Sequence, residues 1–142
     1  PERLIKYWQE YGFCGWGRGI FWLVNPLDYN DILQTWLEGT EFSKRVELGV
    51  DSYHVIGRGA FGDLIVWGKT SGQSIDINSN FGMLFPTDST DDITEDGEEL
   101  TVDLFFATLS KESLDQKKIP NFSLLTRYLN LFLKLTLYAI IV

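Results

Sequence analysis

Three glycines, Gly57, Gly59 and Gly62, stand in the G-x-G-x-x-G spacing of the protein-kinase glycine-rich loop. Lys69 follows in the next strand-like run, and a kinase uses such a lysine to pair with the ATP phosphates. The other parts of a kinase are missing, because the sequence has no H-R-D, D-F-G or A-P-E motif and 142 residues are too few for two lobes. We therefore expect a β-hairpin whose turn contains glycine, between two strands rich in β-branched and aromatic residues.

The chain has one histidine and one cysteine, His54 and Cys14. His54 is near Asp51 and Asp63 in the sequence, which could support acid–base chemistry, but no Ser or Cys nucleophile motif accompanies it. We expect a structural histidine and a half-buried thiol. A Cys/His zinc site and an internal disulfide are excluded, and the single cysteine fits a reducing, cytosolic compartment. These residues therefore predict no catalytic residues, no metal site and no cofactor.

The net charge of −8 is concentrated in one segment. Residues 70–110 hold nine acidic residues and no Lys or Arg, whereas the rest of the chain carries a net charge of +1. Such a segment repels nucleic-acid phosphates and attracts basic surfaces, which disfavours direct nucleic-acid binding through this region. A solvated acidic loop that aids solubility explains the same pattern without any partner.

Hydrophobic patterns and turn residues divide the chain into short elements. Helices are predicted over residues 1–11, 26–39 and 98–110, and strands over residues 19–25, 53–57, 63–68, 73–77 and 81–85. Residues 40–51 are expected to form a polar connection and Thr87–Gly97 an acidic loop. Sequential short strands joined by tight turns make an antiparallel meander. The predicted fold is therefore α+β, a single domain in which helices flank an antiparallel β-meander sheet.

The apolar side chains of these elements supply the expected core, since 44% of the residues are hydrophobic. In the third helix, Leu100, Leu104, Phe105 and Leu109 fall on one face. Four of the five tryptophans lie in apolar runs and are expected in the core, whereas Trp16, which stands between glycines, is expected in a turn.

Residues 121–142 are strongly apolar, but Arg127, Asn130 and Lys134 interrupt them, so we expect no membrane span. A terminal core element, helix then strand, is one interpretation of this segment. An exposed surface for a partner or a second copy is the other.

Four aromatic-rich blocks follow one another along the chain: YWQEYGFCGWGRGIFWLVNP, YHVIGRGAFGDLIVWGKTSGQS, GMLFPTD and LFFATLSKESLD. In this order they resemble the GAD-like family, which includes immunity proteins of bacterial type VI secretion that protect against DNase toxins. The resemblance covers residues 2–115. We therefore divide the chain into a GAD-like α+β domain over residues 1–115 and a divergent apolar segment over residues 116–142 that packs on or extends it. Family members usually begin some tens of residues earlier, so Pro1 is expected inside a longer natural chain.

The resemblance implies a cytoplasmic, non-catalytic immunity protein that binds and neutralises a cognate toxin, a nuclease. The acidic segment and the interrupted apolar tail predict that this protein itself contacts neither nucleic acid nor membrane. It leaves the oligomeric state open. The family name also points to a domain found in tRNA-dependent amidotransferases and some aspartyl-tRNA synthetases, so an accessory binding module that faces tRNA is the alternative. A small enzyme built on the glycine-rich turns is a third hypothesis, and it lacks a convergent set of catalytic groups.

A nuclease that holds a phosphate backbone presents a basic cleft, which an inhibitor can occupy with carboxylates. The resemblance carries no toxin-contact residues onto this chain, so the charge pattern supplies the candidates. The candidate toxin-binding residues are Asp88, Asp91, Asp92, Glu95, Asp96, Glu98 and Glu99.

Overall fold

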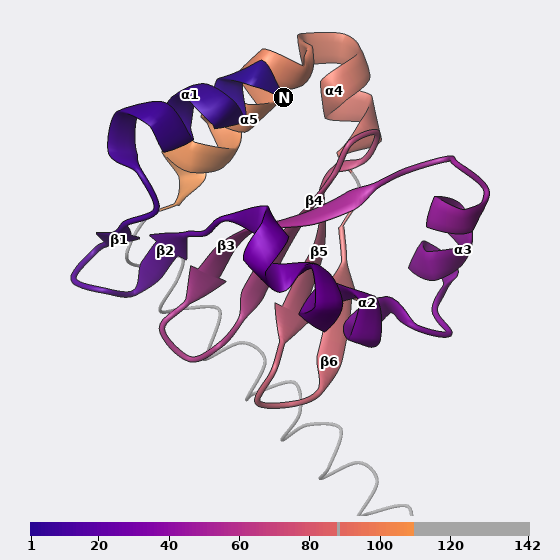
Figure 1. Ribbon diagram of the computed structural model, residues 1–142. Coiled ribbons are helices and arrows are strands. Elements are labelled where there is room, and N and C mark those ends of the chain that lie inside the picture. The colour runs from indigo at the N-terminus through magenta and orange to yellow at the C-terminus, as the bar shows by residue number, and fades with distance from the viewer. Residues whose placement is uncertain (88, 110–142) are drawn as a thin grey trace, which may run out of the picture. The chain divides into compact units, whose positions relative to one another are not determined.

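The computed structural model describes residues 1–87 and 89–109, and the predicted segment 116–142 lies outside them. At the centre is a six-stranded sheet in the order β1-β2-β3-β4-β5-β6, so each strand pairs antiparallel with the next one along the chain (Figure 1). The strands are β1 (Gly15–Trp16), β2 (Phe21–Leu23), β3 (Tyr53–Gly59), β4 (Leu64–Gly68), β5 (Gly72–Asn78) and β6 (Met83–Pro86). The predicted α+β fold, an antiparallel meander flanked by helices, is confirmed.

Short helices surround this sheet. In the described residues they are α1 (Glu2–Tyr11), the 3-10 helix η1 (Pro26–Tyr29), α2 (Asn30–Leu37), α3 (Glu41–Glu47), α4 (Thr90–Asp96) and α5 (Glu98–Thr108). Figure 1 shows α2 across the front of the sheet and α1 beside α5. The start of η1 follows from its sequence, because Pro26 suits a first helical position and the Asn25 side chain accepts a hydrogen bond from the Leu27 N–H at 3.2 Å.

One face of the sheet packs against α2 and α3. Val55, Val66 and Ile75 lie side by side on three neighbouring strands, because the register pairs Val55 with Val66 and Val66 with Ile75. Leu37 of α2 and Phe42 of α3 belong to the same buried cluster. Burying a side chain of this size contributes about 1.5–3 kcal/mol relative to exposure. This cluster therefore holds α3 against the sheet.

The opposite face packs against α5. Side chains alternate along a strand, so Trp67 of β4 points away from the side of its neighbour Val66. Trp67 is 2% exposed, and its ring meets that of Phe105 edge-on, with 6.0 Å between centroids. Val102, one turn earlier on α5, is fully buried. Helices thus cover both faces of the meander.

An ion pair joins α1 to α5. The Arg3 Nε donates to both carboxylate oxygens of Asp103, at 2.7 and 2.9 Å, and Nη2 donates to Oδ2 at 2.5 Å. The Tyr7 hydroxyl also donates a hydrogen bond to Asp103 Oδ1 at 3.1 Å. The Tyr7 ring stacks on the Phe106 ring, with 4.2 Å between the ring centroids. These contacts connect residues about a hundred positions apart in sequence, so α1 depends on α5 for its place.

We expect acid to weaken this link. The Arg3 hydrogen bonds, with a smaller contribution from Tyr7, hold the pKa of Asp103 below its ordinary value of 3.8. A carboxyl whose pKa is lower in the folded state contributes stability above its unfolded pKa, and that contribution is lost as the pH falls through the folded value. Asp103→Asn should therefore be less stable than wild type at neutral pH, and the difference should vanish in strong acid.

Urea unfolding of both proteins across this pH range measures the effect. Asp31→Asn on the exposed side of α2 is the matched control, and its stability difference should stay small at every pH. Equal stability of Asp103→Asn and wild type at pH 7 would contradict the role given to the ion pair.

Two polar stretches are helices, contrary to the sequence-based prediction. The polar connection predicted over residues 40–51 contains α3, which Phe42 anchors at 8% exposure. The acidic loop predicted over Thr87–Gly97 contains α4, whose Ile93 packs on the β4–β5 turn. A Cβ on Gly72 in that turn would come within 3.1 Å of Ile93 Cδ1. Each helix has few inward apolar residues, so no periodic pattern marks it in the sequence.

The predicted apolar face of α5 is also wrong, apart from Phe105. The buried residues of α5 are Thr101, Val102 and Phe105. Leu100 and Leu104 are 47% and 48% exposed, and Leu109 follows the end of the helix. Apolar residues occur on every side of α5, so packing against Trp67 rather than sequence pattern selects the buried face.

The ends of the sheet differ slightly from prediction. Trp16, expected in a turn, instead forms the two-residue strand β1 together with Gly15. In this strand, Gly15 pairs with Trp22 of β2. A Cβ on Gly15 would lie 2.5 Å from the Trp22 indole nitrogen, so the pairing needs glycine here. The last strand begins at Met83, two residues later than predicted.

Candidate functional site

Six of the seven acidic candidates lie on α4 and in the first turn of α5 (Figure 1). Asp91 and Glu95 are exposed and stand four residues apart, which places them on one face of α4. Glu98 is half-buried, and Glu99 is exposed but accepts a hydrogen bond from the Arg3 backbone N–H at 3.0 Å. The structure therefore brings Asp91 and Glu95 together, while Glu99 is engaged with α1.

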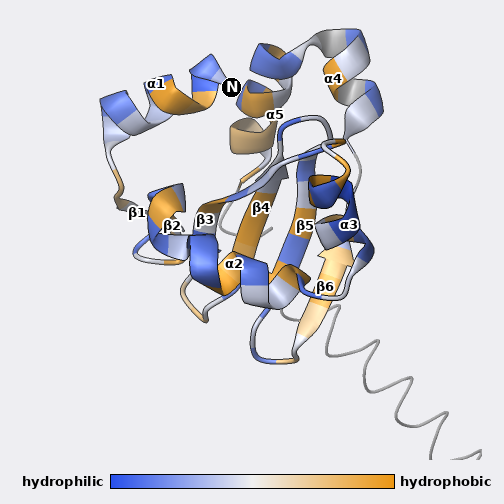
Figure 2. Ribbon diagram, turned by 45° about the vertical axis from the view of Figure 1, so that its right-hand side comes forward, coloured by the Kyte–Doolittle hydropathy of each residue, from blue (hydrophilic) through white to orange (hydrophobic). Residues whose placement is uncertain are grey.

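The other three candidates are not described. Asp88 lies outside the described residues, and so do the side chains of Asp92 and Asp96. The backbone still places Asp92 and Asp96 on α4, where Figure 2 shows mostly hydrophilic residues in contrast to the apolar strand β4. Four carboxylates on one seven-residue helix make α4 the most acidic element of the described chain.

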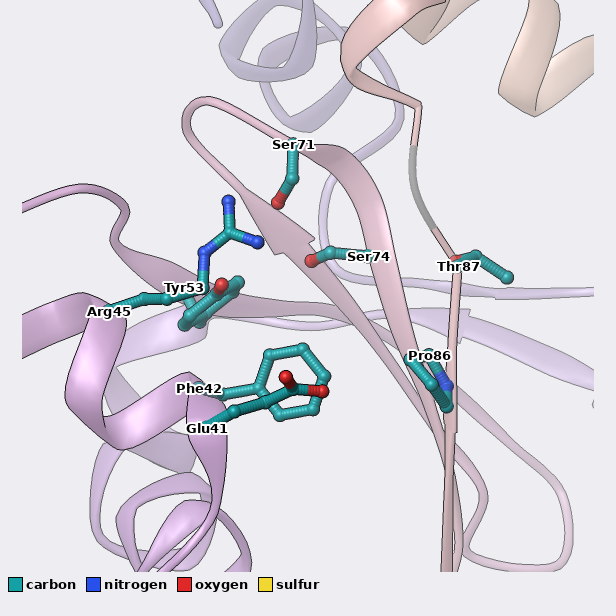
Figure 3. Close-up of a pocket in the computed structure, with 8 residues that line it drawn as sticks. All are labelled: Glu41, Phe42, Arg45, Tyr53, Ser71, Ser74, Pro86 and Thr87. Atoms are coloured by element: carbon teal, nitrogen blue, oxygen red, sulfur yellow. The ribbon is translucent and has the colours of Figure 1, made fainter.

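A pocket of about 200 Å³ opens between α3 and the strands β3, β5 and β6 (Figure 3). Its lining residues are Glu41, Phe42, Arg45, Tyr53, Ser71, Ser74, Pro86 and Thr87. Figure 3 shows the Arg45 guanidinium and the hydroxyls of Tyr53, Ser71 and Ser74 converging on one side. Figure 3 shows the Glu41 carboxylate apart from this polar group. No sequence motif marks this pocket.

A buried carboxylate organises the polar side. Asp51 is 7% exposed, and its Oδ1 accepts the backbone N–H groups of Ser52 and Thr70, both at 2.8 Å. Its Oδ2 accepts the Ser71 hydroxyl at 2.5 Å, and Arg45 Nη2 lies 3.7 Å from it. Asp51 thereby fixes the Ser71 hydroxyl and draws the Arg45 guanidinium toward the pocket.

Two hydrogen-bond donors in the pocket remain unused. The Tyr53 hydroxyl and Arg45 Nε are buried atoms with no hydrogen-bond partner among the described residues. Tyr53 is 7% exposed, and its ring meets Phe42 edge-on at 5.6 Å. Burial, and then the nearby Asp51 charge, raise the pKa of Tyr53, so its hydroxyl keeps its proton at neutral pH. The pocket therefore offers donors for a ligand acceptor.

The glycine motif forms the predicted hairpin. Gly57 and Gly59 lie in β3, and Gly62 lies in the turn with φ +86°. The Gly59 N–H donates to the Asp63 carbonyl at 2.7 Å, which closes the turn. A Cβ on Gly57 would lie 2.5 Å from the Phe21 ring, so this glycine makes room for an aromatic side chain.

The histidine and cysteine do not meet. His54 is exposed on β3, and Cys14 is exposed between α1 and β1, so the expected half-buried thiol is wrong. Among residues 1–87 and 89–109, no cluster of His, Cys, Asp and Glu could hold a metal ion. None of the helices described for this chain combines the length and the apolar run that crossing a bilayer requires.

A group of exposed aromatic rings lies near β1. Trp16 is 37% exposed and meets Tyr11 edge-on at 5.1 Å, while Phe13 is 55% exposed and lies 5.9 Å from the Trp8 ring. Aromatic residues are enriched at protein interfaces, so this aromatic group is a second surface that a partner could use.

Comparison with known proteins places the fold. The chain is similar to the crystal structure of Atu4351 from Agrobacterium tumefaciens, with a TM-score of 0.65 and 21% sequence identity. The similarity covers 80% of this chain and 49% of that one, so this chain spans about half the length of the Agrobacterium protein. At this identity the likeness establishes the fold. None of the curated proteins compared with the chain matches it.

The family follows from the sequence itself. The family model of the GAD-like domain matches residues 1–81, more than half of the chain. This match runs from α1 through the β5 strand and includes both the glycine hairpin and most of the pocket lining. The protein belongs to the GAD-like domain family.

Proposed function

We propose that the protein is an immunity protein that binds and neutralises a cognate type VI secretion DNase toxin in the cytoplasm. The observation that carries the proposal is the match of residues 1–81 to the GAD-like domain, because the sequence resemblance to that family implies this role. The protein would act by binding, without catalysis.

The acidic helix α4 supports this role and suggests how it works. A DNase that grips a phosphate backbone needs a basic cleft, and carboxylates can occupy the positions of phosphates. Asp91 and Glu95 are exposed on one face of α4, at the spacing of one helical turn. Like charges at this spacing repel each other, so they favour a positively charged partner. The same charge disfavours the alternative, a tRNA-facing module, on this side of the domain.

The first test is inhibition of a nuclease. If the gene beside this one encodes a nuclease, that nuclease is purified, and its cleavage of plasmid DNA is measured with and without the protein. We expect equimolar protein to abolish cleavage and calorimetry to show a one-to-one complex. Undiminished cleavage in the presence of folded protein would contradict the proposal.

The second test concerns the surface. Neutralising α4 should slow association with the nuclease roughly tenfold at low salt and flatten its salt dependence, because complementary charge acts mainly on the association rate. The fold should be unchanged, since Asp91 and Glu95 face solvent. The variant combines Asp91→Asn, Asp92→Asn, Glu95→Gln and Asp96→Asn.

A control removes the same number of charges elsewhere. Its substitutions, all at exposed positions, are Glu2→Gln, Asp31→Asn, Glu38→Gln and Glu47→Gln. The control should associate at nearly the wild-type rate. If the α4 variant associates as fast as the control and still inhibits the nuclease, α4 is not the contact. The aromatic group around Trp16 would then be the surface to mutate next.

A further inference from the structure

The pocket between α3 and the sheet holds buried donors that the fold does not use. The Tyr53 side chain is more than nine-tenths buried, yet its hydroxyl has no partner among the described residues, and neither has Arg45 Nε. A buried polar group without a partner destabilises a protein, so such groups are uncommon unless an ordered water or a ligand pairs with them. Figure 3 shows both groups on the same side of the pocket. They define a subsite for a hydrogen-bond acceptor.

The other end of the pocket has the opposite character. Glu41 begins α3 and lines the pocket, and Figure 3 shows its carboxylate apart from the Tyr53 and Arg45 groups. Glu41 is exposed, so it forms the mouth of the pocket, and it accepts hydrogen bonds and positive charge. Donors lie deep in the pocket and an acceptor lies at its mouth.

The charged side chains at the pocket indicate which kind of ligand it binds. Arg45 is the cation of the pocket, and it is partly neutralised by Asp51, whose Oδ2 lies 3.7 Å away. Because Glu41 adds a further negative charge at the mouth, a simple anion would be repelled there. A simple cation would leave the Tyr53 hydroxyl and Arg45 Nε unpaired. A ligand with an anionic end and a cationic end satisfies both.

The size of the pocket sets an upper limit on the ligand. Drug-sized ligands occupy pockets of about 300–1,000 Å³. A pocket of about 200 Å³ suits a molecule with few heavy atoms, and the Phe42 ring and Pro86 provide apolar walls for a short aliphatic part.

We propose that this pocket binds a free α-amino acid, with its carboxylate at Tyr53 and Arg45 and its ammonium group at Glu41. The binding is reversible and involves no chemical step. It is independent of the proposed toxin binding, because it uses α3, β3, β5 and β6 rather than α4.

The experiment titrates the purified chain with each of the twenty common L-amino acids, followed by ligand-observed NMR and by calorimetry. Acetate and methylammonium serve as probes that carry only one end of the amino acid. We expect saturable binding of one or a few small amino acids, and at least tenfold weaker binding of either probe, because each probe lacks one charge-assisted contact.

Three variants locate the site. Tyr53→Phe removes the hydroxyl and keeps the ring, so it should weaken amino-acid binding about tenfold. It should leave the melting temperature of the free protein unchanged or raise it, because the hydroxyl has no partner there. Glu41→Gln at the exposed mouth should also weaken binding about tenfold. Glu47→Gln, at the other end of α3, is the matched control and should bind as wild type does.

Several results would overturn the proposal. One is the failure of every amino acid to bind in the millimolar range. Another is acetate binding as tightly as the best amino acid, since a site for any carboxylate needs no Glu41. A third is an amino acid that binds Tyr53→Phe and Glu41→Gln as tightly as wild type. If Tyr53→Phe fails to fold, Glu41→Gln alone decides, because its side chain is at the surface.

Discussion

Replacing Gly57 with alanine should lower the free energy of unfolding by about 2–3 kcal/mol, at the upper end of the cost of overpacking a core. A Cβ at this position would lie 2.5 Å from Phe21 Cζ and 3.3 Å from the Trp22 carbonyl oxygen. Phe21 is 2% exposed, so its ring has no open space into which it could turn. Either the ring or the pairing of β2 with β3 must shift.

Gly59 provides the matched control, two residues along the same strand. A Cβ there would meet atoms of Asp63 at ordinary contact distances, the nearest being Cβ at 3.5 Å. Gly59→Ala should therefore lower the free energy of unfolding by much less than Gly57→Ala does. The double variant Gly57→Ala with Phe21→Leu should lose less free energy of unfolding than the two single variants lose together. The reason is that the smaller leucine side chain leaves room for the Cβ at position 57. Urea unfolding compares the four variants, Gly57→Ala, Gly59→Ala, Phe21→Leu and the double variant, with wild type. Equal stability of the two glycine variants would contradict the packing role of Gly57.

The surroundings of Gly57 include one feature that the sequence predicts and one that it does not. The β3–β4 hairpin was predictable because two β-branched strands flank a glycine-containing turn, and Gly62 does adopt a positive φ in that turn. The packing of Phe21 on Gly57 was not predictable. It depends on the pairing of β2 with β3, whose residues are more than thirty positions apart, and no local pattern records that register.

Helices were predictable where apolar residues repeat. The first helix matches its prediction because Leu4 and Trp8 share a face and Gly12, at φ +69°, ends it. By contrast, α4 is held by Ile93 amid charged residues, so its pattern resembles that of a solvated loop. The half-buried Ile93 and the hydrogen bond from the Ser89 N–H to the Ser71 carbonyl hold α4 at the β4–β5 turn, and these contacts exist only in the folded chain.

The pocket could not be found from the sequence, because its residues come from distant segments. Arg45 comes from α3, Tyr53 from β3, Ser74 from β5 and Pro86 from β6. None of these residues belongs to a recognisable motif. One signal was present in the sequence: Asp51 precedes a buried strand, and a carboxylate in such a place needs partners. Those partners are the groups that organise the pocket.

Removing the Asp51 carboxylate should therefore be among the most damaging single changes in the domain. Asp51→Ala is expected to cost about 3–5 kcal/mol, the range seen when one partner of a buried charged network is deleted. The change would leave the N–H groups of Ser52 and Thr70 and the hydroxyl of Ser71 without their acceptor. It would also weaken the link between the α3–β3 connection and the β4–β5 turn, which would then rest on the hydrogen bonds from the Thr70 hydroxyl to the Val50 carbonyl and from the Lys69 N–H to the Ser52 carbonyl.

Asp51→Asn keeps the shape of the side chain and removes its charge. The amide oxygen can still accept the two backbone N–H groups, but the amide nitrogen is a donor that faces the Ser71 hydroxyl and the Arg45 guanidinium, so about half of the alanine loss should remain. Glu47→Ala, on the exposed surface of α3, should change the unfolding free energy by less than about 0.5 kcal/mol. Denaturant unfolding of the three variants gives the ranking directly. If Asp51→Ala were no worse than Glu47→Ala, the hydrogen bonds to Asp51 would not stabilise the fold. The β4–β5 turn would then have to be held by other contacts, such as the hydrogen bond from the Lys69 N–H to the Ser52 carbonyl at 2.9 Å.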